Sequence, residues 1–164
     1  MKISFFTIGG TIDKVYFDAK SKYEIGESII DTILKNGRVN FEYEICSLLK
    51  KDSLDMTKKD RSLIFKAVQK ENNDKIIITH GTDTMVETAL VLTPLTDKTI
   101  VLTGAMEPAR FKTSDAVFNL GLAVAAVQSL PKGIYLSISG RIFTPDNVQK
   151  NTDLKMFEEK VSPF

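Results

Sequence analysis

The chain has 164 residues, of which 43% are hydrophobic and 26% are charged, and this composition is typical of one globular domain with a substantial core. Its net charge of +1 provides no overall field that would attract nucleic acid or an anionic membrane, so we expect neither as a partner. The lone cysteine, Cys46, excludes a disulfide framework, and the lone histidine, His80, leaves no second ligand for a histidine-based metal site. We therefore expect neither a metal ion nor a cofactor.

The N-terminal segment is interpreted as a strand and not as an export signal. Residues 1–14 contain a short apolar run but no cleavage site of small residues. The longest nearly uncharged stretch, 116–131, is shorter than the ~20 residues that cross a bilayer. Because the lone thiol also suits a reducing compartment, we expect the protein in the cytoplasm.

Strand-like and helix-like patterns alternate along the chain. In chain order they predict a strand at 3–8, a helix at 28–34, a strand at 45–49, a helix at 58–70, a strand at 76–79, a helix at 83–92, a strand at 100–103, a helix at 114–130 and a strand at 133–139. Thr57 followed by Asp60 predicts an N-terminal cap for the second helix. The alternation predicts an α/β domain with a doubly wound, mainly parallel sheet, a flavodoxin- or Rossmann-like three-layer fold.

We expect residues 1–150 to form the core of this domain and 151–164 to form a surface tail or an interface arm. In doubly wound sheets, ligands bind beyond the carboxyl ends of the strands. The segments there read GGTID, DSLDM, THGTDT, TGAMEP and SGRIF, so this edge of the sheet is where we expect any functional site.

The first of these segments places a hydroxyl at the sheet edge. Gly9 and Gly10 let the backbone turn sharply and approach a ligand, which presents Thr11. Taken alone, the fragment favours an ordinary turn with a capping threonine. Thr11 is internal, so as a nucleophile it needs a base from elsewhere. Tyr23 supplies a second hydroxyl if its segment folds back as a flap; otherwise it is a half-exposed aromatic residue on a loop.

The segment after the third strand is the most specific. Gly81, Thr82 and Asp83 place a hydroxyl and a carboxylate at a helix N-terminus, where free backbone N–H groups favour bound negative charge. Alternatively, Asp83 only caps the helix and Thr82 only forms the turn. For His80 we expect a structural role, hydrogen-bonded to backbone. Lys150 is a further candidate, because a threonine that acts as a nucleophile needs a proton acceptor, and a lysine beside a carboxylate can help to accept that proton.

Several of these fragments, together with SDAVFNL and NVQKN, occur in the order seen in bacterial-type L-asparaginases, and the chain resembles the N-terminal domain of that family. The resemblance implies hydrolysis of L-asparagine, with L-glutamine as a second candidate substrate, to the acid and ammonia through a threonine acyl-enzyme. It implies that the catalytic residues are Thr11, Tyr23, Thr82, Asp83 and Lys150. The implied substrate-binding residues are Gly10, Ser53, Leu54, Gly81 and Ala105.

Two positions depart from the family pattern: Leu54 stands where a polar residue often contacts the substrate, and Glu107 stands where arginine is common. The family also has a C-terminal domain, which supplies an acidic residue across a subunit interface and which we expect this chain to lack. We therefore expect a homodimer or homotetramer. The alternatives are a non-catalytic module that binds a small amino acid in the same cleft, and a purely structural domain. Read without the family, Ser53 only caps or precedes the next helix.

Overall fold

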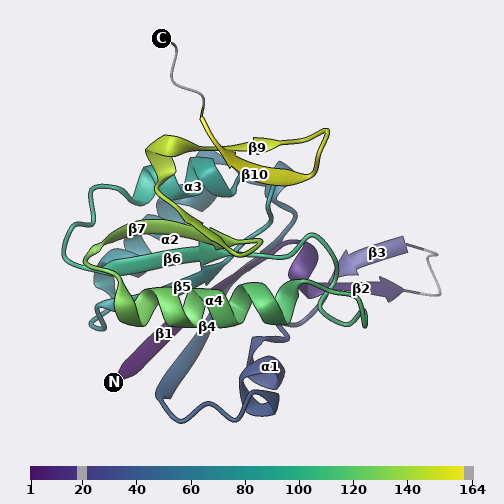
Figure 1. The fold of residues 1–164 in the computed structure, drawn as a ribbon, viewed down its shortest axis with the longest axis horizontal. Helices are drawn as coiled ribbons and strands as arrows, with labels where there is room; N and C mark the ends of the chain where they lie inside the picture. The colour runs from purple at the N-terminus through teal and green to yellow at the C-terminus, as the bar shows by residue number, and fades with distance from the viewer. Residues whose placement is uncertain (18–21, 161–164) are drawn as a thin grey trace.

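The structure, a computed structural model, describes residues 1–17 and 22–160. Its main sheet, within these residues, contains β1 (Lys2–Gly9), β4 (Glu42–Lys51), β5 (Lys75–Thr79), β6 (Thr99–Thr103), β7 (Gly133–Ile138) and β8 (Arg141–Phe143). The strands lie in the order β4-β1-β5-β6-β7-β8 (Figure 1). All neighbours are parallel except β7 and β8, which are antiparallel. The predicted doubly wound, mainly parallel sheet is confirmed, and its first five strands have the flavodoxin-like order.

The strands are apolar on both sides because helices cover both faces of the sheet. In β5, Ile76 and Ile78 point into one hydrophobic core, and Ile77 points into the other. The first core is closed by α2 (Lys58–Lys70) and α3 (Met85–Leu92). The second is closed by α1 (Ile30–Asn36) and α4 (Ala116–Ser129). This arrangement confirms the three-layer architecture.

Helix ends follow the local sequence signals closely. The Thr57 side chain accepts a hydrogen bond from the Asp60 amide, and the Asp60 carboxylate accepts one from the Thr57 amide, so the predicted cap of α2 is confirmed as a capping box. Helix α3 begins at Met85 with Thr84 as the N-cap, two residues later than the predicted start at 83. Asp83 is therefore not the cap of this helix and remains available for other contacts.

Two small hairpins project from the sheet, and neither was predicted as a pair of strands. In the flap hairpin, β2 (Lys14–Phe17) pairs antiparallel with β3 (Lys22–Ile25). In the C-terminal hairpin, β9 (Val148–Asn151) pairs antiparallel with β10 (Met156–Glu159). Figure 1 shows the flap hairpin beside the turn after β1 and the C-terminal hairpin above α3.

The C-terminal hairpin crosses the boundary that the sequence placed at residue 150. Within the segment interpreted as a tail, residues 156–159 form a strand, and Phe157 packs into the core beside α3 with 3% of its surface exposed. Residues 161–164 lie outside the described part of the chain. In that part, no helix is long and apolar enough to cross a membrane.

Candidate active site

Glycines bring three turns into backbone contact at the carboxyl edge of the sheet. Gly10 has a positive φ of 85°, and a side chain there would place its Cβ 2.4 Å from the Gly81 nitrogen. A Cβ on Gly81 would in turn lie 2.6 Å from the Ser53 hydroxyl. Only glycine fits at these two positions, because any side chain would overlap the neighbouring turn. The turns after β1, β4 and β5 are thereby locked together at the point where the strand order reverses.

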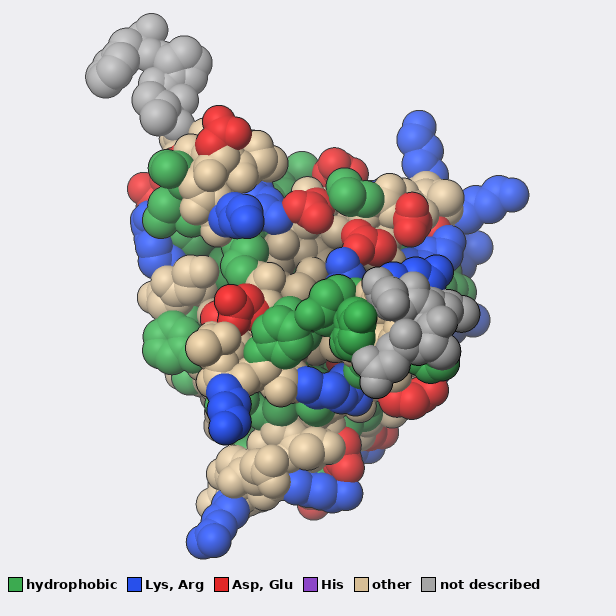
Figure 2. Space-filling model, turned by 90° about the vertical axis from the view of Figure 1, so that its right-hand side faces the viewer, with side chains coloured by type: hydrophobic (Ala, Val, Ile, Leu, Met, Phe, Trp, Pro, Cys, Tyr) green, Lys and Arg blue, Asp and Glu red, His purple; other side chains and the backbone are tan. Residues whose placement is uncertain are grey.

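A cavity of about 270 Å³ opens at this edge. Its lining includes four of the predicted catalytic residues and three residues that the sequence did not indicate: Thr11, Thr82, Asp83, Met106, Lys150, Thr152 and Lys155. Figure 2 shows the molecule from this side, with acidic and basic side chains interspersed and apolar side chains between them. The structure therefore brings residues from the turns after β1, β5 and β6 and from the C-terminal hairpin to one place.

Lys150 joins the two predicted residues of the turn after β5. Its Nζ atom donates to Thr82 Oγ1 at 2.8 Å and to Asp83 Oδ1 at 2.5 Å. Thr82 is buried, and the Lys150 side chain is 13% exposed, whereas that of Asp83 is 40% exposed. A hydroxyl, an amine and a carboxylate are thus in direct contact at the rim of the cavity, an arrangement that can move a proton to or from a reacting group.

Thr11 differs from Thr82 in having a free hydroxyl. It is the first residue of a short 3-10 turn, Thr11–Asp13, that directly follows the two glycines. Its side chain is half-buried and lines the cavity, but its hydroxyl forms no hydrogen bond with any residue that the structure describes. The hydroxyl is therefore available to a ligand in the cavity.

His80 has the structural role that the sequence predicted. Its Nδ1 lies 2.7 Å from the Gly81 carbonyl oxygen, and its Nε2 lies 2.9 Å from the Thr88 hydroxyl. A carbonyl oxygen only accepts, so Nδ1 carries the proton and Nε2 accepts from Thr88. Burial lowers the pKa of His80 from 6.5 to about 4, which keeps the ring neutral.

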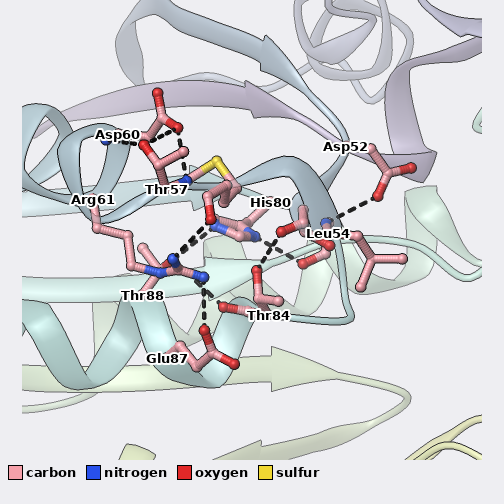
Figure 3. Close-up of polar contacts among 12 residues, drawn as sticks. Asp52, Leu54, Thr57, Asp60, Arg61, His80, Thr84, Glu87 and Thr88 are labelled. Atoms are coloured by element: carbon pink, nitrogen blue, oxygen red, sulfur yellow. Dashed lines mark hydrogen bonds and ion pairs between the residues drawn. The ribbon is translucent and has the colours of Figure 1, made fainter.

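Further polar contacts fix the turn after β5 from behind (Figure 3). The Thr84 hydroxyl donates to the Ser53 carbonyl at 2.8 Å, which ties the start of α3 to the turn after β4. Arg61 donates to the Met56 carbonyl and pairs with Glu87, and so joins α2 to α3. These contacts hold the turn that carries Thr82 and Asp83 against α2 and the turn after β4.

Six predicted residues lie outside the lining of this cavity: Gly10 and Gly81, in the turns described above, and the four that follow. Tyr23 is 48% exposed on β3, where its ring packs edge-on against Tyr16 and Phe111 at centroid distances of 5.4 and 6.0 Å. Leu54 is 72% exposed. Ser53 is almost fully buried, and its hydroxyl has no hydrogen-bond partner among the described residues. Ala105 is fully buried in the core that α4 closes.

The loop after β6 is positioned by two polar residues at the start of α4, its N-cap Asp115 and Asn119 in its first turn, whose role the sequence did not reveal. Asp115 accepts hydrogen bonds from the Met106 and Glu107 amides at 3.0 and 3.1 Å. Asn119 donates to the Gly104 carbonyl at 3.0 Å and to Asp115 at 2.8 Å. The sequence did contain a signal for these contacts, because an acid and an amide four residues apart at the start of a largely apolar helix need polar partners.

The other missed residues, Thr152 and Lys155, come from the turn between β9 and β10. Asn151 shapes this turn by accepting a hydrogen bond from the Leu154 amide at 3.0 Å, and Lys155 has a positive φ of 50°. Lys155 forms no ion pair or hydrogen bond within the described part of the chain. In that part, no group of three or more His, Cys, Asp or Glu side chains could hold a metal ion.

Comparison with known proteins agrees with this geometry. The family model described as Asparaginase, N-terminal, matches residues 2–161. The chain belongs to this family. A relative from Haemophilus influenzae, named a probable periplasmic L-asparaginase, is 32% identical over 163 residues, which cover 92% of this chain and 46% of the relative.

Two solved structures of family members superpose closely. The thermostable L-asparaginase from Thermococcus kodakarensis has a TM-score of 0.84 at 28% identity, covering 99% of this chain and 52% of that one. A probable cytoplasmic L-asparaginase from Campylobacter jejuni has a TM-score of 0.80 at 30% identity, covering 96% and 51%. The chain thus spans about half the length of the asparaginases it matches.

Proposed function

We propose that this chain provides an asparaginase-type active site that hydrolyses L-asparagine to L-aspartate and ammonia. The observation that carries the proposal is the contact of Lys150 with Thr82 and Asp83 in the cavity that also contains the free hydroxyl of Thr11. Relatives named L-asparaginase or glutaminase-asparaginase support the reaction class, and they make L-glutamine the second substrate to test.

In the proposed mechanism, the Thr11 oxygen attacks the side-chain amide carbon of the substrate. Its proton passes toward Thr82 and Lys150, and the amine must first lose the proton that it now donates to Thr82. The nearby backbone N–H groups stabilise the oxyanion. Thr82 and Lys150 then return the proton to the leaving nitrogen, and collapse of the intermediate releases ammonia. Water then hydrolyses the ester on Thr11, which restores the hydroxyl and frees aspartate.

The remaining predicted residues do not line the cavity. We propose that they reach the substrate from a neighbouring element or through their main-chain groups. Tyr23 contributes if the flap hairpin closes over Thr11. Gly10, Gly81 and Ala105 contribute main-chain groups, and Ser53 contributes its unpaired hydroxyl. Leu54 has the least support, because its side chain is apolar and mostly exposed.

The charges around the cavity suit an amino-acid ligand. Asp83 is paired with Lys150, whereas Lys155 has no partner among the described residues, so the lining carries one uncompensated positive charge. We propose that Lys155 attracts the carboxylate of the ligand while Asp83 holds its ammonium group. No contact specifically favours the non-catalytic binding module, and we do not propose it.

We also propose that the chain self-associates as a homodimer or homotetramer. Helix α4 buries one side in the core, but Val117 and Phe118 on its other side are 61% and 64% exposed. Light scattering at micromolar concentration tests this, and a monomer contradicts it. A cytoplasmic location is likewise proposed from the sequence; the relatives named above include one described as cytoplasmic and one as periplasmic.

The direct test is ammonia release from asparagine and from glutamine by the purified chain. We expect release by the wild-type chain, loss of release in Thr11→Ala and Lys150→Met, and unchanged release in the matched control Thr32→Ala, whose threonine is exposed on α1. Wild-type release from Thr11→Ala would disprove the nucleophile, and no release from the wild-type chain would disprove the activity.

A further inference from the structure

A buried acid, Asp13, connects the turn that carries Thr11 to the flap hairpin, and the proposed mechanism does not use it. It ends the 3-10 turn Thr11–Asp13, and only 2% of its surface is exposed. Carboxylates are rarely buried unless they are paired. Asp13, however, forms no ion pair among the residues that the structure describes. Its position therefore needs an explanation.

Asp13 holds the chain where it leaves the flap hairpin. Its carbonyl oxygen accepts a hydrogen bond from the Gly26 amide at 2.8 Å, directly beside the Lys14–Ile25 pair that closes the hairpin. Its side-chain Oδ1 accepts a second bond from the Ile29 amide at 3.1 Å. One residue thus fixes both the end of β3 and the start of the segment that leads into α1.

The same junction includes the loop that carries the aromatic partner of Tyr23. The Ala109 amide donates to the carbonyl of Ile12, the residue before Asp13, at 3.1 Å. Two residues further along this loop, the Phe111 ring packs against Tyr23. The main chain of Ile12 and Asp13 therefore joins the Thr11 turn, the root of the flap hairpin and the loop that carries Phe111.

We propose that Asp13 is a positioning residue that joins the root of the flap hairpin, held by its main-chain carbonyl, to the segment before α1, held by its buried carboxyl group, and thereby sets the position of Tyr23 relative to Thr11. The inference rests on the proposed function only for the role of the flap in substrate binding. The anchor itself rests on the two hydrogen bonds and on burial.

The surroundings of Asp13 make this anchor sensitive to pH. Burial raises its pKa from 3.8 to about 6, against the opposing effects of the Ile29 amide, Arg110 and the Ser28 hydroxyl; Glu27 adds a smaller rise. Because burial raises this pKa, the buried position of Asp13 favours the neutral acid. Ionisation above about pH 6 therefore disfavours the anchored position, and the root of the hairpin loosens as pH rises through 6.

A fluorescent reporter in the flap hairpin tests the anchor without any enzyme assay. The chain contains no tryptophan, so Tyr16→Trp places a single reporter on β2, opposite Tyr23. We expect its emission or anisotropy to change with a midpoint near pH 6. The change should disappear in Tyr16→Trp with Asp13→Asn, because the amide oxygen still accepts from Ile29 but no longer titrates. It should persist with the matched control Asp97→Asn, an exposed acid. No transition near pH 6, or a transition that persists with Asp13→Asn, overturns the proposal.

A kinetic arm then relates the anchor to the proposed function. At pH 7.5, Asp13→Ala should raise KM for asparagine about tenfold with little change in kcat, and Asp13→Asn should restore KM to within about threefold of the wild-type value. Equal KM values in the wild-type chain and Asp13→Ala would overturn the positioning role. If the wild-type chain releases no ammonia, the proposed activity fails, while the fluorescence titration still decides whether Asp13 anchors the hairpin.

Discussion

Two turns at the carboxyl edge of the sheet contain the same Gly-Thr pair in different surroundings. In the turn after β5, the Thr82 hydroxyl accepts a hydrogen bond from Lys150, which also pairs with Asp83. In the turn after β1, the Thr11 hydroxyl has no partner within the described residues. One turn is arranged to handle protons and charge, and the other leaves a hydroxyl free for a ligand.

The buried titratable groups beneath the two turns differ in a related way. His80 is neutral and uses both ring nitrogens in contacts within its own turn and helix α3. Asp13 accepts hydrogen bonds from the Gly26 and Ile29 amides, which lie in the segment after the flap hairpin. The same short motif therefore acquires its role from distant segments that pack against it, and the motif itself does not encode these segments.

Replacing each threonine sharpens this comparison most strongly. We expect Thr11→Ala and Thr82→Ala each to reduce ammonia release by at least about 10³-fold, since each removes a member of the reacting set. Thr82→Ala should also lower the free energy of unfolding by about 1 kcal/mol because Lys150 loses a buried acceptor. Thr11→Ala should change it by less than about 0.5 kcal/mol. Urea denaturation measures the free energy of unfolding of both variants, and equal losses of stability would contradict the difference between the turns.

The contact between the two turns can be broken at Gly10. Gly10→Ala combines a strained positive φ with a Cβ 2.4 Å from the Gly81 nitrogen, so we expect it to lower the free energy of unfolding by about 2–4 kcal/mol. Gly121→Ala is the control, because its Cβ meets nothing within 4 Å on helix α4. This variant should raise stability by up to about 1 kcal/mol. A harmless Gly10→Ala would mean that the turns are not in contact.

The two buried titratable groups predict opposite pH dependences of stability. The pKa of Asp13 is raised to about 6, so its contribution is present below about pH 4 and is lost as pH rises through 6. The pKa of His80 is lowered to about 4, so its contribution is present above pH 6.5 and is lost as pH falls through 4. Each amounts to at most about 3 kcal/mol.

Between pH 4 and 6, these contributions oppose each other in the wild-type chain. Asp13→Asn should therefore make the free energy of unfolding rise more steeply with pH, and His80→Gln should make it fall with pH. Chemical denaturation at several pH values in this range measures the slopes. Because slopes and not absolute stabilities are compared, an overall loss of stability in either variant does not affect the result; parallel slopes in all three proteins would refute the assignment.

The smallest expected effect concerns Lys155, whose charge has no partner among the described residues and lies at the cavity. Lys155→Met should weaken aspartate binding about threefold, the magnitude of an exposed ion pair. The difference should vanish near 1 M salt because exposed charges are screened. Lys132→Met, at the opposite edge of the sheet, provides the control. Calorimetric titration that shows equal affinity for Lys155→Met and the wild-type chain at low salt would remove Lys155 from the site.

Local patterns in the sequence predicted the main elements well because they depend on near neighbours. The apolar run at 76–79 and the cap of Thr57 with Asp60 require only adjacent residues, and both are confirmed. The flap and C-terminal hairpins were missed because their strands are short and mixed in polarity, so no period stands out. The buried position of Phe157 likewise depends on the core that α2 and α3 close, to which no local signal points.

The sequence by itself determined where the main strands lie in the chain and that most of them run parallel, and hence that Thr11 and Thr82 lie at one edge of one sheet. The tertiary structure alone decided which side chains meet there. Lys150 reaches Thr82 across 68 residues because the C-terminal hairpin folds over the edge. Tyr23 and Ser53 occupy equally suggestive positions in the sequence but lie outside the cavity lining. Element type follows from periodicity along the chain, whereas the order of the strands in the sheet and the side-chain contacts depend on packing between segments that periodicity does not relate.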